Sequence, residues 1–391
     1  MSEYQYYEFQ AIDRPLTREE MAEVGRLSSR TDPTPARAVF TYSYGDFRGD
    51  PEDVLAKYYD AMLYLANWGS KQLMFRIPRS ALDADALAPY CLDEVIETSV
   101  TGAYLIVDVS FFEEEGLGWI EGEGYLSSLI RLRDDLLRGD FRFLYLAWLK
   151  AASMRVMDEE EWEAYDPEVD EIYDYEIGRD TLEPPVPAGL QDLTAPLQEF
   201  IDLFEIDGDL IAVAAQASPS MQPARALDVE ALLSRLPEAE RFQLLVRVAR
   251  GDAHVRHALT KRLRALDQED EPTAPATPLP RRAIGDLLAA AEEHVVQRKE
   301  EARRKAEEAR LRKLNEMAPV EPQLWDDVFA LIEEKKAKPY EQAVALLVDL
   351  RDLAGHLGER GRFDAQLRAL QNKYSTRQGL LRRLREAGLI K

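Results

Sequence analysis

Histidine and cysteine are the residue types best suited to nucleophilic or metal chemistry, and the chain has four histidines and one cysteine. His254 and His257 stand three positions apart on a predicted helix, but no His-Glu-x-x-His zinc motif follows them. Residues 1–253 contain no histidine, so a Ser-His-Asp or Cys-His device in the first domain would need its base from the later helices. Cys91 alone cannot form a disulfide or a cysteine-based zinc site within the chain, and we interpret it as a small buried residue.

Carboxylates offer a second kind of chemistry. Asp46, Asp50 and Asp53 in YGDFRGDPED could hold a hard cation, but the EF-hand pattern is absent and Asp50 is also well placed to cap a helix. The glycine-rich stretch GLGWIEGEGY precedes a helix, as phosphate cradles do, yet Glu121 and Glu123 would repel a phosphate. A carboxylate- or metal-dependent enzyme centred on Asp46, Asp50, Asp53 and Glu121 therefore stays an alternative, and we expect no cofactor.

Two regions carry candidate interaction residues. Residues 158–183 alternate acids with aromatic side chains that commonly anchor interfaces, and the candidates there are Trp162, Tyr165, Tyr173 and Tyr175. The tail holds the most basic local patches, where the candidates are Lys335, Lys336, Arg382 and Arg383. A solvated acidic loop and solvated helix ends are the simpler explanations of the same residues.

Charge separates the two halves of the chain. The net charge is −24, and residues 1–190 hold 17 basic and 39 acidic side chains, whereas residues 281–391 hold 23 and 19. The acidic half repels nucleic acid and anionic membranes, so contact with nucleic acid is expected through the tail only. No apolar run is long enough to span a membrane, and the N-terminus MSEYQYYEF lacks a signal-peptide pattern.

The elements that must position these residues follow from periodicity and capping signals. Strands are expected at 1–12, 36–44, 73–77 and 103–111, the last near the centre of a sheet, and helices at 17–29, 125–138 and 141–156. The first of these helices starts with a Thr17–Glu20 capping box. A further helix is expected from Asp50 and Pro51 to a stop at Gly69, with an apolar face of Val54, Leu55, Tyr58, Met62 and Leu65.

Composition divides the α+β chain into six parts. They are an α+β domain with its sheet packed by helices (1–157), an acidic loop and the Pro-rich linker PPVPAG (158–189), a helical region (190–266), a second linker (267–283), a long charged helix (284–318) and a helical hairpin tail (319–391). Between Gln297 and Lys313 the long helix has few apolar residues and several Glu–Arg or Glu–Lys pairs at i, i+4 spacing. This pattern favours a solvated spacer helix over a coiled coil.

Two stretches carry resemblances. The opening EYQYYEFQAIDRPLT, with YGDFRGDP at 44–51 and YLANWGSKQLMFRIP at 64–78, resembles an uncharacterised family of bacterial proteins, which implies a bacterial, intracellular setting and no particular activity. Residues 339–389 are similar to the helical tail of bacterial SWIM-type zinc-finger proteins. Because the zinc ligands of that family include several cysteines, no zinc function carries over to a chain with Cys91 alone.

These observations favour a non-enzymatic, cytoplasmic interaction or adaptor protein, which would act through its helical tail and acidic surface on a protein partner. The alternatives are the carboxylate- or metal-dependent enzyme described above and a nucleic-acid-associated accessory factor. The sequence indicates neither a substrate nor the identity of a partner.

Overall fold

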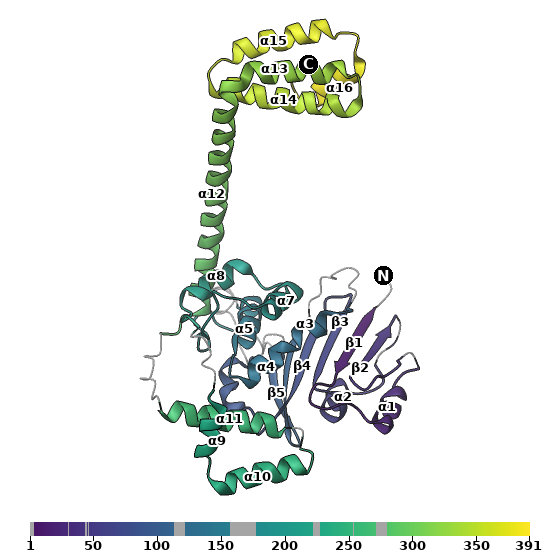
Figure 1. Ribbon diagram of the computed structural model, residues 1–391, viewed down its shortest axis with the longest axis vertical. Helices are drawn as coiled ribbons and strands as arrows, with labels where there is room; N and C mark the ends of the chain where they lie inside the picture. The colour runs from purple at the N-terminus through teal and green to yellow at the C-terminus, as the bar shows by residue number, and fades with distance from the viewer. Residues whose placement is uncertain are drawn as a thin grey trace, which may run out of the picture. The chain divides into compact units, whose positions relative to one another are not determined.

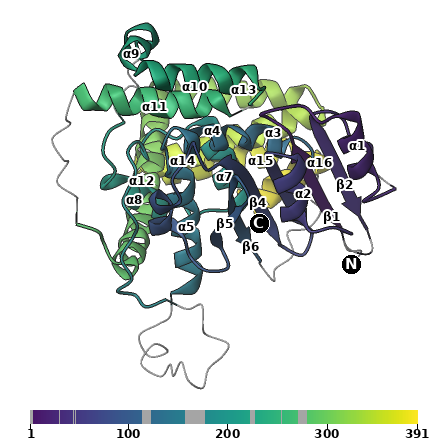
Figure 2. The ribbon, with the colours of Figure 1, turned by 90° about the horizontal axis from the view of Figure 1, so that it is seen from below.

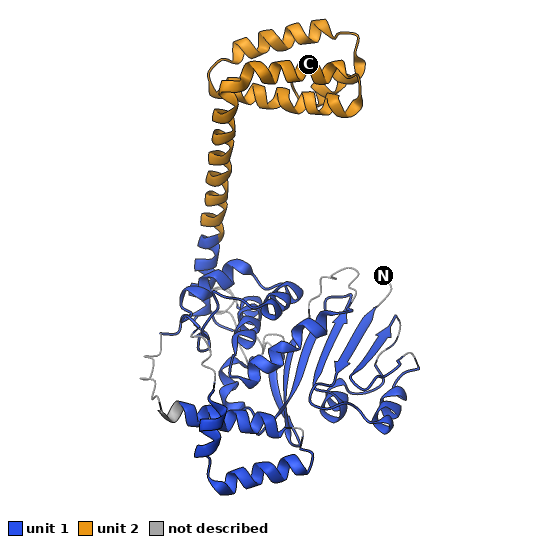
Figure 3. Ribbon diagram, in the orientation of Figure 1, with its two compact units in different colours: residues 1–294 blue, residues 295–391 orange. Residues whose placement is uncertain are grey.

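The computed structural model describes residues 4–29, 31–43, 45, 47–112, 122–156, 177–221, 227–252, 254–270 and 280–391. The chain separates into two compact units, residues 1–294 and 295–391, which have separate hydrophobic cores (Figure 3). None of the helices in the described ranges is both long and apolar enough to cross a bilayer. The two units are described one at a time.

A single antiparallel sheet organises unit 1. Among the described residues it has six strands in the order β2-β1-β3-β4-β6-β5 (Figure 1). The strands are β1 (Gln5–Gln10), β2 (Arg37–Tyr42), β3 (Ala61–Ala66), β4 (Lys71–Pro78), β5 (Ile96–Thr101) and β6 (Tyr104–Phe111). A sheet packed with helices, followed by helical regions, confirms the predicted α+β class.

Both faces of the sheet are covered, because side chains alternate between the faces along each strand. Tyr6 of β1 belongs to the core with α3 (Tyr125–Leu129), α4 (Arg131–Leu137), α5 (Arg142–Arg155) and α7 (Ala195–Phe204). Tyr7 and Phe9 belong to a second core, with α1 (Arg18–Gly25) and α2 (Pro51–Tyr58). The predicted capping box of α1 is confirmed, with both the Thr17 and the Glu20 hydrogen bonds present.

One predicted helix is wrong in its second half. The helix begins as expected with Asp50 as its cap, but α2 ends at Tyr58 and residues 61–66 form strand β3. Every residue of β3 is buried, so its apolar run has no alternation that would distinguish a strand from a helix. Pairing with β1 and β4 decides the outcome, and Gly69, at φ 111°, lies in the turn between β3 and β4 instead of ending a helix.

The position of β6 also differs from the prediction. It lies between β4 and β5, one strand from the edge, instead of at the centre of the sheet. The reason is β5, whose sequence IETSVT is mostly polar and exposed and therefore gives little strand signal. With β5 in place, β3 and β4 are the central pair.

The segment PPVPAG, predicted as a linker, is held against unit 1. The Tyr90 hydroxyl donates to the Pro185 carbonyl at 2.8 Å, and the Gly189 N–H donates to the Pro219 carbonyl at 2.8 Å. Next to it, the fully buried Glu183 accepts hydrogen bonds from the Tyr145 hydroxyl at 2.5 Å and from Arg282 at 2.7 Å. These contacts hold the segment to the turn at Ala88–Tyr90, to α5 and to the chain that follows α8 (Gly208–Gln216).

Three further helices of unit 1 form a sub-structure that we call the flap, residues 227–252 and 254–270. They are α9 (Val229–Arg235), α10 (Glu238–Ala249) and α11 (Val255–Asp270), with α11 packed along both α9 and α10 (Figure 2). The flap has a hydrophobic cluster of its own, built on the buried leucines Leu232, Leu236, Leu263 and Leu266.

Unit 2 is all helical. The long helix α12 (Ile284–Met317) begins in unit 1 and leads into α13 (Glu321–Glu333), α14 (Ala337–His356), α15 (Arg360–Lys373) and α16 (Gln378–Glu386). A short 3₁₀ turn at Ala318–Val320 joins α12 to α13, and two others, at Ala84–Ala86 and Ala88–Tyr90, belong to unit 1. Side chains at 296–313 of α12 are exposed, as expected of a solvated helix, and Leu314 is the first to enter the core of unit 2.

Candidate functional site

Part of the predicted chemistry lies outside the described residues. This is the case for Trp162, Tyr165, Tyr173 and Tyr175 and for two members of the proposed carboxylate centre, Asp46 and Glu121. Asp50 accepts hydrogen bonds from the backbone N–H groups of Glu52 at 2.8 Å and Asp53 at 3.3 Å, which is the geometry of a helix cap. The described residues contain no group of three or more His, Cys, Asp or Glu side chains placed to hold a metal ion.

The predicted basic residues of unit 2 differ in their availability. Lys335 and Lys336 are exposed in the turn between α13 and α14. Arg382 is exposed and lies 3.7 Å from Glu386, whereas Arg383 binds Glu341 at 3.1 Å and donates to the carbonyl of Gly379. Three of the four side chains are therefore presented to solvent.

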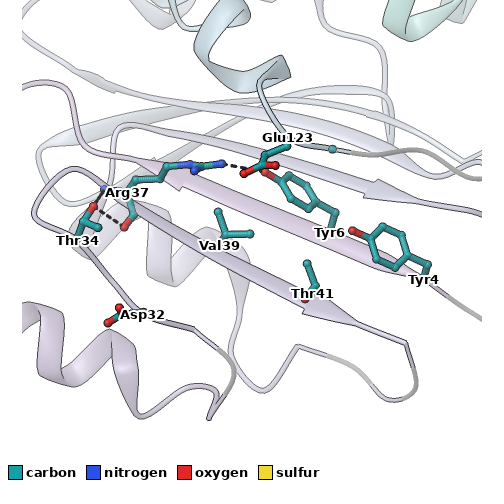
Figure 4. Close-up of a pocket in the computed structure, with 9 residues that line it drawn as sticks. Tyr4, Tyr6, Asp32, Thr34, Arg37, Val39, Thr41 and Glu123 are labelled. Atoms are coloured by element: carbon teal, nitrogen blue, oxygen red, sulfur yellow. Dashed lines mark hydrogen bonds between the residues drawn. The ribbon is translucent and has the colours of Figure 1, made fainter.

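Unit 1 contains a hollow over strands β1 and β2 that we call the tyrosine pocket (Figure 4). Its volume is about 530 Å³, and it is lined by Tyr4, Tyr6, Asp32, Thr34, Arg37, Val39, Thr41, Gly122 and Glu123. Figure 4 shows Arg37 reaching along the sheet toward the Tyr6 hydroxyl, which accepts its hydrogen bond at 3.3 Å.

A buried carboxylate organises the tyrosine pocket. Glu8 accepts hydrogen bonds from Arg37 at 2.6 Å, from Gln10 at 2.8 Å and from the Tyr6 hydroxyl at 2.6 Å. Burial and the neighbouring Glu8 raise the pKa of Tyr6, so its phenol stays protonated and acts as a donor. With Arg37 engaged by Glu8, the charged groups that remain at the pocket wall are the acids Asp32 and Glu123.

A second buried carboxylate, Asp13, lies in the loop between β1 and α1. Arg133 of α4 grips it with two hydrogen bonds, of 2.6 and 3.1 Å. Asp60, which follows α2, accepts from the backbone N–H groups of Ile12 and Asp13 at 2.6 and 2.9 Å and binds Arg76 at 2.7 Å. Arg133 also donates to the carbonyl of Arg76 at 2.8 Å, so the loop, the sheet and α4 are locked together.

The beginning of α11 brings two histidines to Asp13. His257 Nε2 lies 3.4 Å from one carboxylate oxygen, and His254 Nδ1 lies 3.2 Å from the other, although poorly aligned for a hydrogen bond. His254 Nε2 meets the Tyr104 hydroxyl at 3.1 Å. Burial alone would raise the pKa of Asp13, but the contacts with His254, His257 and Arg133 outweigh it and hold that pKa well below its usual range.

Next to this cluster is a cleft of about 330 Å³ that we call the arginine cleft. It is lined by Ile12, Asp13, Arg133, Asp134, Leu137, Arg138, Arg256, His257, Thr260 and Arg264. Four arginines thus face two aspartates in a chain whose net charge is −24. The lining therefore carries more positive than negative groups, and an excess of one sign in a cleft favours ions of the opposite sign.

The arginines of the cleft are not equivalent. Arg133 is committed to Asp13, and Arg138 forms an ion pair with Asp135. Among the described residues, Arg256 and Arg264 have no carboxylate partner; Arg264 makes only a long contact of 3.5 Å to the carbonyl of Leu137. Burial and the positive charge of Arg138 lower the pKa of Arg264, as expected of a cation that lacks a counter-charge.

Sequence reasoning selected His254 and His257 and stated that a base for the first domain had to come from later helices. The sequence did not predict that both histidines lie beside Asp13. His257, for example, is 244 positions away from Asp13 in the chain. A further signal was visible in the sequence: Arg256, Thr260 and Arg264 are spaced i, i+4, i+8 and therefore share one face of α11.

Comparisons with protein-family models, with curated proteins and with solved structures find no match to this chain. The two resemblances noted in the sequence therefore stay predictions. The observations that bear on function are the contacts and charges of the two sites described above.

Proposed function

We propose that unit 1 binds a small anionic ligand, bearing phosphate or carboxylate groups, in the arginine cleft. The observation that carries this proposal is the pair Arg256 and Arg264, which line a cleft without a carboxylate partner among the described residues. An arginine fork matches the oxygens of phosphate and carboxylate groups in a bidentate manner. Arg256 is exposed, but Arg264 is partly buried, and a partly buried cation without a counter-charge is costly to keep, which supports a bound anion at Arg264.

Binding fits this site better than catalysis. Arg133 and the two histidines surround Asp13, and they form the floor of the cleft. The alternative, a carboxylate enzyme, was predicted to be centred on Asp46, Asp50, Asp53 and Glu121. Of these residues, Asp50 serves as a helix cap. The proposal therefore assigns recognition of a ligand, and no reaction, to this unit.

The test is calorimetric titration of the full-length protein with sodium phosphate and with citrate at low ionic strength. We expect binding of at least one anion, and a loss of about tenfold in affinity for Arg264→Gln, because a charge-assisted hydrogen bond contributes roughly 1.5–3 kcal/mol. Arg241→Gln is the matched control, since Arg241 is exposed on α10 of the same flap and does not line the cleft. Equal binding by both variants would exclude the cleft as the site.

A second function, that of an adaptor acting through unit 2, is supported by a different observation. Unit 2 has a separate core, and α12 leads into it with exposed side chains at 296–313, which suits a module that docks on a protein partner. The exposed Lys335 and Lys336 favour an acidic surface on that partner. We place the protein in the bacterial cytoplasm, where a single free cysteine, Cys91, is ordinary.

The adaptor proposal is tested by affinity capture from the native host with the full-length chain. The double variant Lys335→Glu/Lys336→Glu should lose a partner that the parent protein retains. The matched control is Lys299→Glu/Arg303→Glu on the exposed part of α12, which makes the same change of charge at a distance along the chain. Loss of the partner from both variants would indicate a non-specific charge effect and reject the docking surface.

A further inference from the structure

The two walls of the arginine cleft belong to different sub-structures of unit 1. Asp13 comes from the loop between β1 and α1, and Arg133 and Arg138 come from α4 and its C-terminal cap; we call the sheet with these elements the body. Arg256 and Arg264 come from α11 of the flap. The leucine cluster of the flap includes no residue of the body. The cleft therefore marks a joint between two separately packed parts.

The joint itself is polar. Contacts of α11 with the body include those of His254 with Tyr104 and Asp13, of His257 with Asp13, and of Arg264 with the carbonyl of Leu137. Polar contacts that exchange with water contribute about 0.5–1.5 kcal/mol each, far less than a packed leucine core. The contacts between the flap and the body therefore contribute less stability than the leucine core inside the flap does.

Like charges face each other across this joint. Arg138 on the body and Arg264 on the flap are close enough for the charge of one to lower the pKa of the other. Arg256 adds a third positive charge, and Asp134 is the one acid of the cleft wall that lacks an arginine partner among the described residues. Repulsion between these arginines opposes the docking of the flap, and an anion bound between them would favour docking.

From this arrangement we propose that the arginine cleft takes a compact diphosphate group, which bridges the body and the flap and fixes α11 in its docked position. The inference rests on the proposed anion-binding function and names its ligand class. A diphosphate offers two phosphoryl groups, one for the flap arginines Arg256 and Arg264 and one for the body arginine Arg138. Arg138 is paired with Asp135, but its side chain is half exposed, so this ion pair is weak and can be exchanged for a phosphoryl group.

The other residues that line the cleft restrict the class of ligand further. The lining contains no Phe, Tyr or Trp side chain on which a nucleobase could stack, and its apolar residues are only Ile12 and Leu137. The volume of about 330 Å³ is at the lower end of ligand sites. A nucleoside attached to the diphosphate would therefore gain little contact.

The experiment compares inorganic diphosphate, orthophosphate and ADP by calorimetric titration of the full-length protein without divalent cations. We expect diphosphate to bind about tenfold or more tightly than orthophosphate, because it neutralises both walls, and ADP to bind no more tightly than diphosphate. Hydrogen exchange measured by mass spectrometry should show slower exchange in α11 on addition of diphosphate, since bridging suppresses local opening of the flap.

Variants on the two walls test the bridge. Arg138→Gln on the body and Arg256→Gln on the flap should each weaken diphosphate binding about tenfold and abolish the slowing of exchange in α11. Arg241→Gln, on the exposed side of the flap, should leave both measurements unchanged, and circular dichroism checks that each variant is folded.

The outcomes separate this inference from the proposed function. Equal affinity for orthophosphate and diphosphate, or tighter binding of ADP than of diphosphate, would overturn the ligand class but leave anion binding in place. Tight diphosphate binding without slower exchange in α11 would overturn the bridge. If none of these anions, nor citrate, binds the parent protein, both the inference and the proposed function fail.

Discussion

The tyrosine pocket and the arginine cleft are each organised by a buried ion pair, but the charged groups that remain around that pair differ in sign. Each is built on a buried carboxylate bound by an arginine, Glu8 with Arg37 in the pocket and Asp13 with Arg133 in the cleft. In the pocket the charged groups that remain are acids, whereas in the cleft the arginines Arg256 and Arg264 outnumber the one remaining acid, Asp134. A buried ion pair fixes geometry, and the groups left unpaired around it determine which ligand a site attracts.

Arg133→Met gives the largest effect that this comparison predicts. The side chain is fully buried and neutralises Asp13, so its loss leaves a buried carboxylate with only the two histidines as partners. We expect the free energy of unfolding of unit 1 to fall by about 3–5 kcal/mol, as found when one partner of a buried pair is removed. Denaturant titration measures this loss.

Arg131→Met on the same helix is the matched control. Arg131 is exposed, so the free energy of unfolding should change by less than about 0.5 kcal/mol. A similar loss of stability in both variants would mean that α4 tolerates no methionine there, and that the ion pair is not the cause.

Asp108 extends the comparison, because it is a largely buried carboxylate that has no arginine partner among the described residues. Its partners are Gln72 at 2.7 Å and Ser110 at 2.8 Å, and Glu97 lies opposite it on β5. Burial, together with the charges of Glu97 and Glu52, raises the pKa of Asp108 to about 6. The folded protein therefore holds this proton more tightly than the unfolded chain does.

The sign of the pH effect follows from that difference. Between pH 4 and pH 6 the folded state binds more protons at Asp108, so its contribution to stability falls as the pH rises and stays low above pH 6. Asp108→Asn should stabilise unit 1 by about 2–3 kcal/mol at pH 7.5 and by much less at pH 4. Unfolding measured at both pH values checks this, and an equal gain at both would contradict it.

The fold was predictable where the signals are local. Strands β1, β2 and β4 have alternating or apolar patterns, and the caps at Thr17 and Asp50 act within a few residues. Strand β3 was not predictable in this way, because its six residues are buried on both faces and its conformation depends on its pairing with β1 and β4.

The sites depend on the fold more strongly than the elements do. Asp13 meets His257 across 244 positions and Arg133 across 120, and no pattern in the sequence records those contacts. What the sequence does contain is the face of α11 that carries Arg256, Thr260 and Arg264. The residues that share a helical face can therefore be predicted from the sequence, but the surface that this face contacts cannot.

Glu8→Gln should cost less than the loss of Arg133, although Glu8 is equally buried. Its arginine, Arg37, has a side chain that is 37% exposed and can be hydrated when the carboxylate is removed. We expect the free energy of unfolding to fall by about 1–2 kcal/mol, the range for the loss of a hydrogen-bonded partner that water can replace in part. A loss as large as that of Arg133→Met would show that exposure of the arginine does not distinguish the two sites.

Arg37→Gln should have the smallest effect, and it completes the comparison. If the unpaired arginines define the anion site, removing an arginine that is already bound to Glu8 should change orthophosphate affinity by less than about twofold, whereas Arg264→Gln changes it about tenfold. Both variants remove one positive charge from unit 1, so the long-range electrostatic effect is matched. A similar loss of affinity in both would mean that the net charge of the unit, and not the cleft, controls anion binding.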